Sequence, residues 1–269
     1  MTRVMQKFEI TSATDVGRVR AHNEDSIAAN PELGLATLAD GMGGYNAGEV
    51  ASGIAVAMVP AEIRKLKEGQ SLNGMSDADV QKMIAMQASK VNAAIFAAAQ
   101  NQKQYSGMGT TLVIAYWHGN RVTIGHLGDS RCYLLRGTEI RSLTRDHSWI
   151  QEQIDAGLMT NEQARLSKKK NLVTRACGID PNVVPEVHTH EVQPGDIYVL
   201  CSDGLYDMVP DADIQLTVSS LKSNLPLAAQ QLLQQANDGG GRDNISVILV
   251  HVLKTAPVGF FARFKNWFK

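Results

Sequence analysis

Residues 110–127 read TTLVIAYWHGNRVTIGHL, two β-forming runs on either side of the turn His118-Gly119-Asn120. β-branched and aromatic residues fill both runs, and a short turn containing glycine between such runs is typical of a hairpin. We therefore predict antiparallel strands over 110–117 and 121–127. This hairpin decides the fold class, because later segments of the chain also show β-forming runs separated by short turns that contain glycine.

Helical patterns precede the hairpin. Residues 47–67 carry Val50, Ile54 and Met58 at four-residue spacing, which predicts an amphipathic helix. Ser76 is a candidate N-cap for a second helix over 77–100. Strands are also expected over 8–14, 34–39, 132–136, 139–143, 183–192, 196–201 and 245–252, with shorter helices over 150–156, 161–165, 211–216 and 226–236.

The order of these elements argues against a parallel sheet. Helices are paired early and strands then cluster, whereas a doubly wound sheet alternates strand and helix. The sequence thus favours an α+β fold with antiparallel sheets flanked by helices. No linker rich in Pro, Gly or Ser divides the chain before residue 254, so we predict one domain over 1–253 and a tail over 254–269.

Composition narrows the class of protein. The chain has 269 residues, of which 44% are hydrophobic and 20% charged, as in ordinary globular proteins. A net charge of −1 gives no general attraction for nucleic acid. The apolar runs are too short to span a bilayer, residues 1–10 lack a signal-peptide core, and three cysteines have no CxxC spacing. We therefore expect a cytoplasmic protein with reduced thiols.

Acidic residues stand at three corners next to apolar runs: Asp40-Gly41, Asp203-Gly204 and Asp243-Asn244. A carboxylate at a strand end projects from a rigid edge, and a glycine beside it lets a ligand approach the backbone. Converging strand ends would gather these carboxylates into one site. Oxygen ligands favour hard cations such as Mg²⁺ or Mn²⁺.

An arginine accompanies further acids near the start of the chain. Arg20 is followed by Glu24 and Asp25. A guanidinium group matches the oxygens of a phosphate in a bidentate fork, so Arg20 is the candidate phosphate ligand. A hard-metal site beside an arginine suggests phosphate chemistry. Any one of these residues alone has a plain interpretation as a turn or surface group; the joint occurrence favours a site.

Six motifs in this order resemble those of the type-2C metal-dependent protein serine/threonine phosphatases, and the DGMGG form is similar to the bacterial branch. They are Arg20-x-x-Asn23-Glu24-Asp25, Asp40-Gly41-Met42-Gly43-Gly44, Gly109-Thr110-Thr111, Gly128-Asp129-Ser130-Arg131, Ser202-Asp203-Gly204 and Asp243-Asn244. Together they span almost the whole chain. The resemblance implies a four-layer αββα sandwich, with two central antiparallel sheets flanked by helix pairs and a flap near 148–171.

The resemblance also implies a binuclear Mn²⁺ or Mg²⁺ centre. Asp40 should bridge the two ions and the Gly41 carbonyl should bind one, while Asp203 and Asp243 should bind the other. Glu24 and Asp25 should act largely through water on the metals, and Arg20 should hold the substrate phosphate. Asp129 matches a residue that, with Asp203, holds a weaker third ion in bacterial members. The segment from Gly128 to Arg131 could instead be a plain turn.

The implied reaction is direct hydrolysis of a phosphate ester by a metal-activated water, without a phosphoenzyme. No Cys-x5-Arg phosphate loop is present, which disfavours a cysteine nucleophile. The general acid stays open. Met42 stands where eukaryotic members have a histidine, and Tyr45 stands where bacterial relatives often carry one. Tyr45 or a metal-bound water could protonate the leaving group.

We thus predict a phosphatase acting on phosphoserine and phosphothreonine in proteins, opposing a bacterial Ser/Thr kinase. Two alternatives remain: a pseudophosphatase that only binds, and a hydrolase of small phosphoesters. Lys168-Lys169-Lys170 in the flap either contacts acidic or phosphorylated partners or is a solvated loop. His188 and His190 lack an evident third ligand and are interpreted as surface strand residues.

The tail has its own pattern. Phe260, Phe261, Phe264, Trp267 and Phe268 form a helical apolar stripe, and residues 254–269 hold four basic and no acidic side chains. Three roles are open: docking on its own domain, binding a partner protein, or weak attachment to an anionic membrane.

Overall fold

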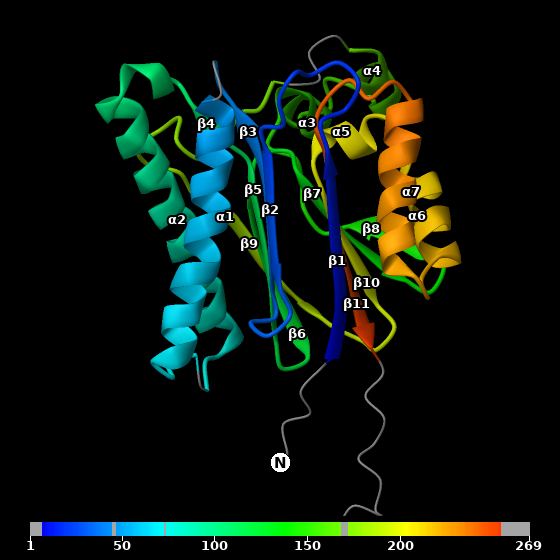
Figure 1. Ribbon diagram of the computed structural model, residues 1–269, viewed down its shortest axis with the longest axis horizontal. Helices are drawn as coiled ribbons and strands as arrows, with labels where there is room; N and C mark the ends of the chain where they lie inside the picture. The colour runs from blue at the N-terminus through cyan, green and yellow to red at the C-terminus, as the bar shows by residue number, and fades with distance from the viewer. Residues whose placement is uncertain (1–6, 45–46, 73, 168–171, 254–269) are drawn as a thin grey trace, which may run out of the picture.

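The computed structural model describes residues 7–44, 47–72, 74–167 and 172–253. These residues form four layers, with two antiparallel β-sheets packed face to face between two layers of helices (Figure 1). The predicted αββα sandwich is confirmed, and so is the prediction that antiparallel pairing dominates. Among the described helices, none is long and apolar enough to cross a membrane.

In the described chain, the first sheet has five strands in the order β1-β11-β10-β7-β8. Their bounds are Lys7–Asp15 for β1, Ile245–Leu253 for β11, Ile197–Cys201 for β10, Arg131–Arg136 for β7 and Glu139–Ser142 for β8. The second sheet has the order β2-β3-β5-β6-β9, and β4 pairs with β3. These strands are Asp25–Asn30 (β2), Leu35–Met42 (β3), Gly109–Thr110 (β4), Leu112–His118 (β5), Arg121–Leu127 (β6) and Glu186–Glu191 (β9).

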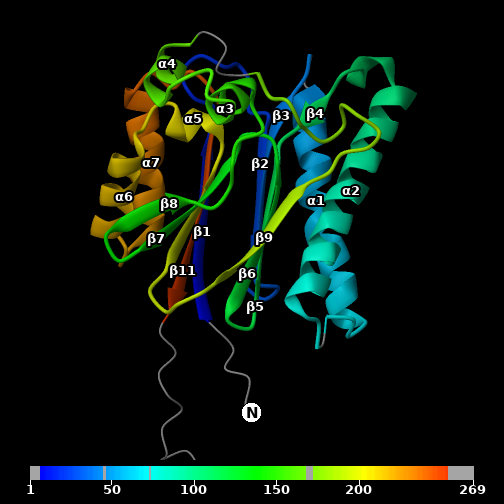
Figure 2. The ribbon, with the colours of Figure 1, turned by 180° about the vertical axis from the view of Figure 1, so that it is seen from behind.

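The long helices cover the outer faces of the sheets. Helices α1 (Ala47–Glu68) and α2 (Asp77–Asn101) pack on the second sheet. Helices α6 (Asp211–Ser220) and α7 (Leu225–Asp238) cover the first, together with the short α5 (Asp203–Tyr206). Between β8 and β9 the chain forms α3 (Trp149–Asp155) and α4 (Asn161–Leu166) at the upper end of the sandwich (Figure 2). A 3-10 turn, η1 (Lys103–Tyr105), follows α2.

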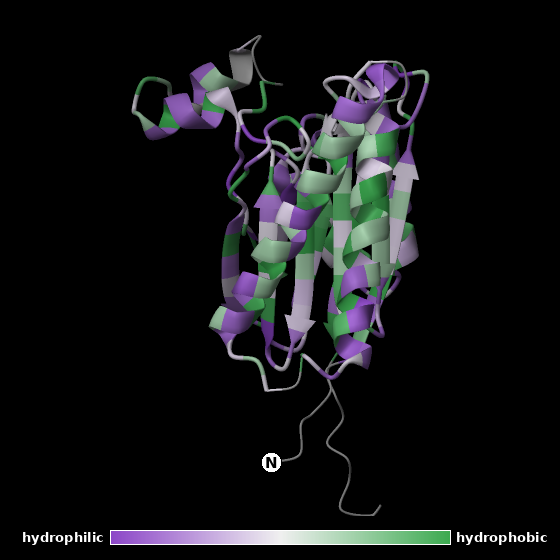
Figure 3. Ribbon diagram, turned by 90° about the vertical axis from the view of Figure 1, so that its left-hand side faces the viewer, coloured by the Kyte–Doolittle hydropathy of each residue, from purple (hydrophilic) through white to green (hydrophobic). Residues whose placement is uncertain are grey.

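Three apolar layers hold these elements together. The layer between the sheets is built from fully buried strand residues, among them Leu38, Val113, Tyr198 and Ile248. Two further layers lie between each sheet and its helices. Figure 3 views the molecule from the side of α1 and α2, with hydrophobic colour along the strands and hydrophilic colour toward the lower ends of these helices. Such burial on both faces of each sheet makes the scaffold rigid.

Helix 77–101 begins as the sequence predicts. The Ser76 side chain accepts a hydrogen bond from the Asp79 N–H, and the Asp79 carboxylate accepts one from the Ser76 N–H, which completes a capping box. The other long helix extends to Glu68 and contains Pro60 without interruption.

Several elements differ from the sequence prediction. Strand β2 was not predicted, because DSIAAN lacks β-branched and aromatic residues apart from one isoleucine. Strand β3 continues through Met42, so Asp40 lies within it rather than after it. The predicted strand over 110–117 breaks at Thr111, and the expected strand over 183–192 is limited to Glu186–Glu191. Tyr45, Lys168–Lys170 and the predicted tail, residues 254–269, lie outside the described residues.

Candidate metal-binding active site

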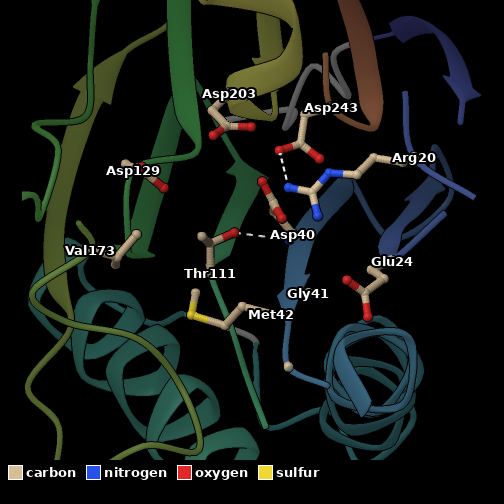
Figure 4. A pocket seen from close by; sticks show the side chains of 11 residues that line it. Arg20, Glu24, Asp40, Gly41, Met42, Thr111, Asp129, Val173, Asp203 and Asp243 are labelled. Atoms are coloured by element: carbon tan, nitrogen blue, oxygen red, sulfur yellow. Dashed lines mark hydrogen bonds and ion pairs between the residues drawn. The ribbon is translucent and has the colours of Figure 1, made fainter. Parts of the chain in front are cut away.

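One pocket opens at the end of the sandwich where β10 ends and β11 begins. Figure 4 shows its lining, which comes from segments far apart in the chain: Arg20, Glu24, Asp40, Gly41, Met42, Gly43, Thr111, Asp129, Val173, Asp203 and Asp243. Seven of the eight predicted site residues are in this set. The eighth, Asp25, lies next to it. The structure therefore brings the candidate residues together.

Hydrogen bonds on both sides fix the backbone of Asp40. Its N–H donates to Thr111 Oγ1 at 2.9 Å, and its carbonyl accepts from Thr110 Oγ1 at 2.8 Å and from the Thr111 N–H at 2.9 Å. Thr111 Oγ1 also shares a 2.7 Å hydrogen bond with Ser130 Oγ. These contacts hold the Asp40 carboxylate in one direction, facing the pocket (Figure 4).

Gly41 occupies a place that no side chain fits. A Cβ atom there would lie 2.2 Å from the Gly48 carbonyl oxygen and 2.5 Å from that of Glu24. The Gly41 N–H donates to the Glu24 carbonyl at 3.1 Å. The glycine therefore allows β3 to pass close to the beginning of α1 and brings Glu24 to the rim of the pocket.

Asn244 ties the loop that carries Arg20 and Glu24 to β11. Its Oδ1 accepts from the Glu24 N–H at 2.8 Å, and its Nδ2 donates to the carbonyls of Val16 at 3.0 Å and His22 at 2.9 Å. In the sequence, Asn244 stands in a motif that predicts no role for its side chain. Both N–H donors of its carboxamide and one of the two acceptor positions on its oxygen hold the two segments together.

Asp25 is a buried neighbour of the pocket rather than part of its lining. Asp25 is 8% exposed and pairs with Asp40 across β2 and β3. One carboxylate oxygen accepts from Ser202 Oγ at 2.8 Å, and Oδ1 has no hydrogen-bond partner among the described residues. Burial raises the pKa of Asp25 to about 6, although hydrogen bonds from Ser246 and Ser202 oppose that shift.

Asp129 and Asp203 face the pocket from the other side (Figure 4). Asp129 lies in the turn between β6 and β7, and Asp203 begins α5. Burial, followed by the charge of Asp146, raises the pKa of Asp129 to about 7. Burial, with repulsion from Asp129 and Asp243, raises the pKa of Asp203 well above its usual range. Asp203 Oδ1 is buried without a partner among the described residues.

Arg20 is the single cationic side chain in the pocket lining as described. Its Nη2 donates to Asp243 Oδ2 at 2.6 Å, while Asp243 Oδ1 accepts from the Asn244 N–H at 2.9 Å. The guanidinium group is about half exposed and extends over the pocket. Its hydrogen bond to Asp243 raises the pKa of Arg20, so its charge is permanent. A carboxylate has about four acceptor positions, so Asp243 can keep both partners and bind a further cation.

The electrostatics of the pocket fit divalent cations. The pKa of Asp40 is raised well above its usual range by burial and then by Asp25, Asp203, Asp129 and Asp243. One arginine cannot neutralise this many carboxylates. Partnerless buried oxygens on Asp25 and Asp203 add to the mismatch. A hard cation with oxygen ligands would relieve both, so the residues present fit Mn²⁺ or Mg²⁺.

Some contributions were not foreseen. Val173 enters the pocket from the segment after α4, and no sequence signal marks it. Thr111 was quoted as part of a motif, and its hydrogen bond to Asp40 is a contact that only tertiary structure reveals. His188 lies on β9 and bonds Glu186 at 2.7 Å, with its side chain about half exposed, away from the pocket lining.

Comparisons with known proteins identify the family of this chain. A family model described as protein phosphatase 2C matches residues 17–237. The serine/threonine phosphatase Stp of Listeria innocua is 37% identical over 240 residues, which cover 88% of this chain and 93% of that one. The protein phosphatase PhpP of Streptococcus pneumoniae is 36% identical over 253 residues, covering 90% of this chain and 97% of that one.

Solved structures share the fold at similar identity. The catalytic domain of the serine/threonine protein phosphatase PstP, solved in complex with two manganese ions, superposes with a TM-score of 0.81. It is 34% identical, and the match covers 93% of this chain and all of that one. With the matched family model spanning most of the sequence, this chain belongs to the protein phosphatase 2C family.

Proposed function

We propose that this protein is a metal-dependent phosphatase that hydrolyses phosphoserine and phosphothreonine in proteins. The observation that carries the proposal is the convergence of Asp40, Asp129, Asp203 and Asp243 with one arginine in a single pocket. A carboxylate pocket of this kind supports phosphate hydrolysis only when cations offset its charge. The names of the relatives, serine/threonine phosphatases, supply the substrate class.

The carboxylates have distinct positions toward the two cations. Asp40, in the middle of the pocket, would bind both ions, and the Gly41 carbonyl would bind one. Asp203 and Asp243 would bind the other, with Asp129 and Asp203 holding a weaker third. Glu24 and Asp25 would orient water around the ions, since Glu24 lies at the edge of the pocket and Asp25 is not part of its lining. When bound, the cations supply positive charge and acidify water at the reacting phosphorus.

Arg20 has the geometry to orient the substrate. Its guanidinium group is anchored on Asp243 by one nitrogen, which leaves further N–H donors facing the pocket. Two parallel N–H donors match two phosphate oxygens, so the phosphoryl group would bind in a fixed orientation. Positive charge beside the transferring group is the main requirement of phosphoryl transfer.

Phosphorylated proteins are the proposed partners, among them a Ser/Thr kinase that this enzyme would oppose. Val19, which precedes the pocket residue Arg20 in the chain, is 69% exposed, so an apolar side chain beside Arg20 is open to a partner. A cytoplasmic location is proposed with it, because the three cysteines are buried as free thiols. No contact in the described residues favours a small phosphoester over a protein.

Phosphate release from a phosphothreonine peptide tests the proposal. The wild-type protein is assayed with EDTA, Mg²⁺ or Mn²⁺, beside Asp203→Asn and a matched control, Asp213→Asn. Asp213 is an exposed carboxylate on α6, so its substitution makes the same chemical change outside the pocket. We expect turnover only with metal, a loss of at least about a hundredfold in Asp203→Asn, and no change in the control.

A parallel assay with p-nitrophenyl phosphate separates substrate classes. Turnover of this small ester without peptide turnover would support the small-phosphoester alternative. A folded wild-type protein without turnover on either substrate, at any metal concentration, would favour the pseudophosphatase alternative and overturn the proposal.

A further inference from the structure

The turn that carries Asp129 is held from two sides. Tyr206, on α5, donates its hydroxyl proton to the Asp129 carbonyl at 3.0 Å. Gly128 has a φ of +99°, and a Cβ atom there would lie 2.6 Å from Thr111 Cγ2. The turn thus packs tightly against the pocket wall, and small changes in its backbone would redirect the Asp129 carboxylate.

His147 holds the other side of this turn. Its N–H donates to the Gly128 carbonyl at 2.9 Å, and its Nδ1 accepts from the Gly128 N–H at 3.2 Å. Both polar backbone groups of Gly128 are therefore bound to one residue, which is itself only 4% exposed. Since Nδ1 accepts, the proton of the neutral imidazole is on Nε2. Burial lowers the pKa of His147 to about 4, so the ring stays neutral under ordinary assay conditions.

The same residue belongs to the base of the flap. The His147 carbonyl accepts from the Thr174 N–H at 2.8 Å, and the Trp149 N–H donates to the Leu172 carbonyl at 2.8 Å. Ser148 and Val173 form an isolated antiparallel bridge between these contacts. Val173 lines the pocket. His147 therefore joins the Gly128–Asp129 turn to the paired segments from which the flap extends.

A metal-ligand role for His147 does not fit its hydrogen bonds. Candidate ligand atoms of His126, His147 and Glu186 lie within 4.8 Å of one another. A cation on His147 Nε2 would move the ring proton to Nδ1, where the Gly128 N–H already points at it. The Arg175 guanidinium group, 3.4 Å from the same Nε2, would also repel a cation. The ring stacks instead on His126, with 4.7 Å between centroids, which fixes its plane.

We propose that His147 is a positioning residue for Asp129. It holds the Gly128–Asp129 turn at the base of the flap, so that the Asp129 carboxylate faces the pocket as a ligand of the weakest cation. The inference rests on the proposed function, because it requires Asp129 to bind a cation. His147, which is not part of the pocket lining, would thus contribute to binding of that cation.

Two substitutions of His147 separate its hydrogen bond from its bulk. In His147→Asn, the side-chain oxygen can replace Nδ1 as acceptor for the Gly128 N–H, whereas His147→Leu removes the acceptor. The readout is equilibrium Mn²⁺ binding, measured from the electron paramagnetic resonance signal of free Mn²⁺, which does not depend on activity. We expect the weakest site to lose about tenfold in affinity in His147→Leu, the usual cost of losing a group that orients a ligand.

The conservative variant and a control complete the comparison. His147→Asn should stay within about twofold of the wild type. The control His251→Leu changes a partly buried histidine near the far end of β11 and should not alter Mn²⁺ binding. Should His147→Leu fail to fold by circular dichroism, His147→Gln takes its place, because its acceptor is one methylene too far to reach the same N–H. Equal affinity in the wild type and the acceptor-free variant overturns the proposal.

A double substitution distinguishes failure of the positioning role of His147 from failure of the proposed cation role of Asp129. Asp129→Ala alone should abolish the weakest site, and adding His147→Leu should then change nothing further. If Asp129→Ala removes the weakest site but adding His147→Leu still weakens the remaining Mn²⁺ sites, His147 acts elsewhere and only the positioning role falls. If Asp129→Ala leaves all Mn²⁺ sites intact, the assigned cation role of Asp129 falls, and the positioning role falls with it.

Discussion

Strand β10 has a carboxylate beyond each of its ends, Asp196 buried and Asp203 partly buried, and the two have opposite electrostatic surroundings. Asp196 precedes the strand, is 1% exposed and receives a bidentate hydrogen bond from Arg136, at 2.8 and 2.7 Å. The Gln193 N–H donates to it as well. Asp203 follows the strand and has no hydrogen bond from an arginine among the described residues, and the charges that act most on it after burial are other carboxylates. Burial alone therefore does not mark a functional acid; burial without a compensating cation does.

The difference has a cost in free energy. Buried charges are stable when paired and hydrogen-bonded, as at Asp196. The pocket end leaves several acids unpaired, which destabilises the metal-free fold and favours any divalent cation that enters. The two ends of one strand thus have separate roles. The paired carboxylate at one end stabilises the fold, and the unpaired carboxylates at the other end favour metal binding.

Isosteric substitution at the two ends should have effects of opposite sign on the free energy of unfolding. Asp196→Asn leaves Arg136 without its charge partner and should destabilise the protein by about 2 kcal/mol, discounted because Arg136 is partly exposed. Asp203→Asn relieves repulsion and should stabilise the metal-free protein by about 1 kcal/mol. Urea denaturation of both variants in EDTA at pH 8 measures the difference. Destabilisation of similar size by both would refute the contrast.

The stability of the metal-free protein should depend on pH because of the unpaired carboxylates at the pocket end. The pKa values of Asp25 and Asp129 are raised to about 6 and about 7, above an unfolded value of about 3.9. Between pH 4 and 7 the folded state therefore holds more protons at these groups than the unfolded state, so their contribution to stability is lost as pH rises. We expect the free energy of unfolding to fall by about 2–3 kcal/mol from pH 5.5 to pH 8.

Calorimetric unfolding in EDTA across this range checks that slope. Saturating Mn²⁺ should abolish it, because the cations replace the protons, and metal affinity should increase with pH. Asp129→Asn should flatten the slope in EDTA, whereas Asp213→Asn should not. A metal-free wild type that gains stability over the same range would show that other groups dominate the titration.

The sequence predicted the acids of the pocket better than the structure around them. Aspartates next to glycine at strand ends are visible as motifs, and the resemblance to the phosphatases assigned an expected role to each of them. The pairing of β2 with β3, which places Asp25 opposite Asp40 on the adjacent strand, was missed because a six-residue strand with few β-forming residues depends on its neighbours. The helical and strand patterns elsewhere were found because their burial follows a clear period.

Contacts that join distant segments leave no local pattern. Asn244 holds residues 220 and more positions away in the chain, and Val173 reaches the pocket because two segments at the base of the flap pair. His147, beside Asp146 and before an N-cap serine, resembles an ordinary loop residue in sequence. Hydrogen bonds of this kind are decided by the tertiary arrangement, so the sequence alone gives no signal for them.

The smallest expected effect is that of removing the Thr111 hydroxyl, a neutral group that supports the carboxylates of the pocket. Thr111 Oγ1 accepts the Asp40 N–H, and Thr111→Val removes that acceptor while keeping the shape of the side chain. A buried N–H left without a partner should cost about 1 kcal/mol of stability. Because the same bond orients Asp40, Mn²⁺ affinity measured by calorimetry should fall several-fold, whereas Thr111→Ser, which keeps the hydroxyl, should retain it. If Thr111→Val lost stability but bound Mn²⁺ as tightly as the wild type, the direction of the Asp40 carboxylate would depend on the β-sheet alone and not on this hydroxyl.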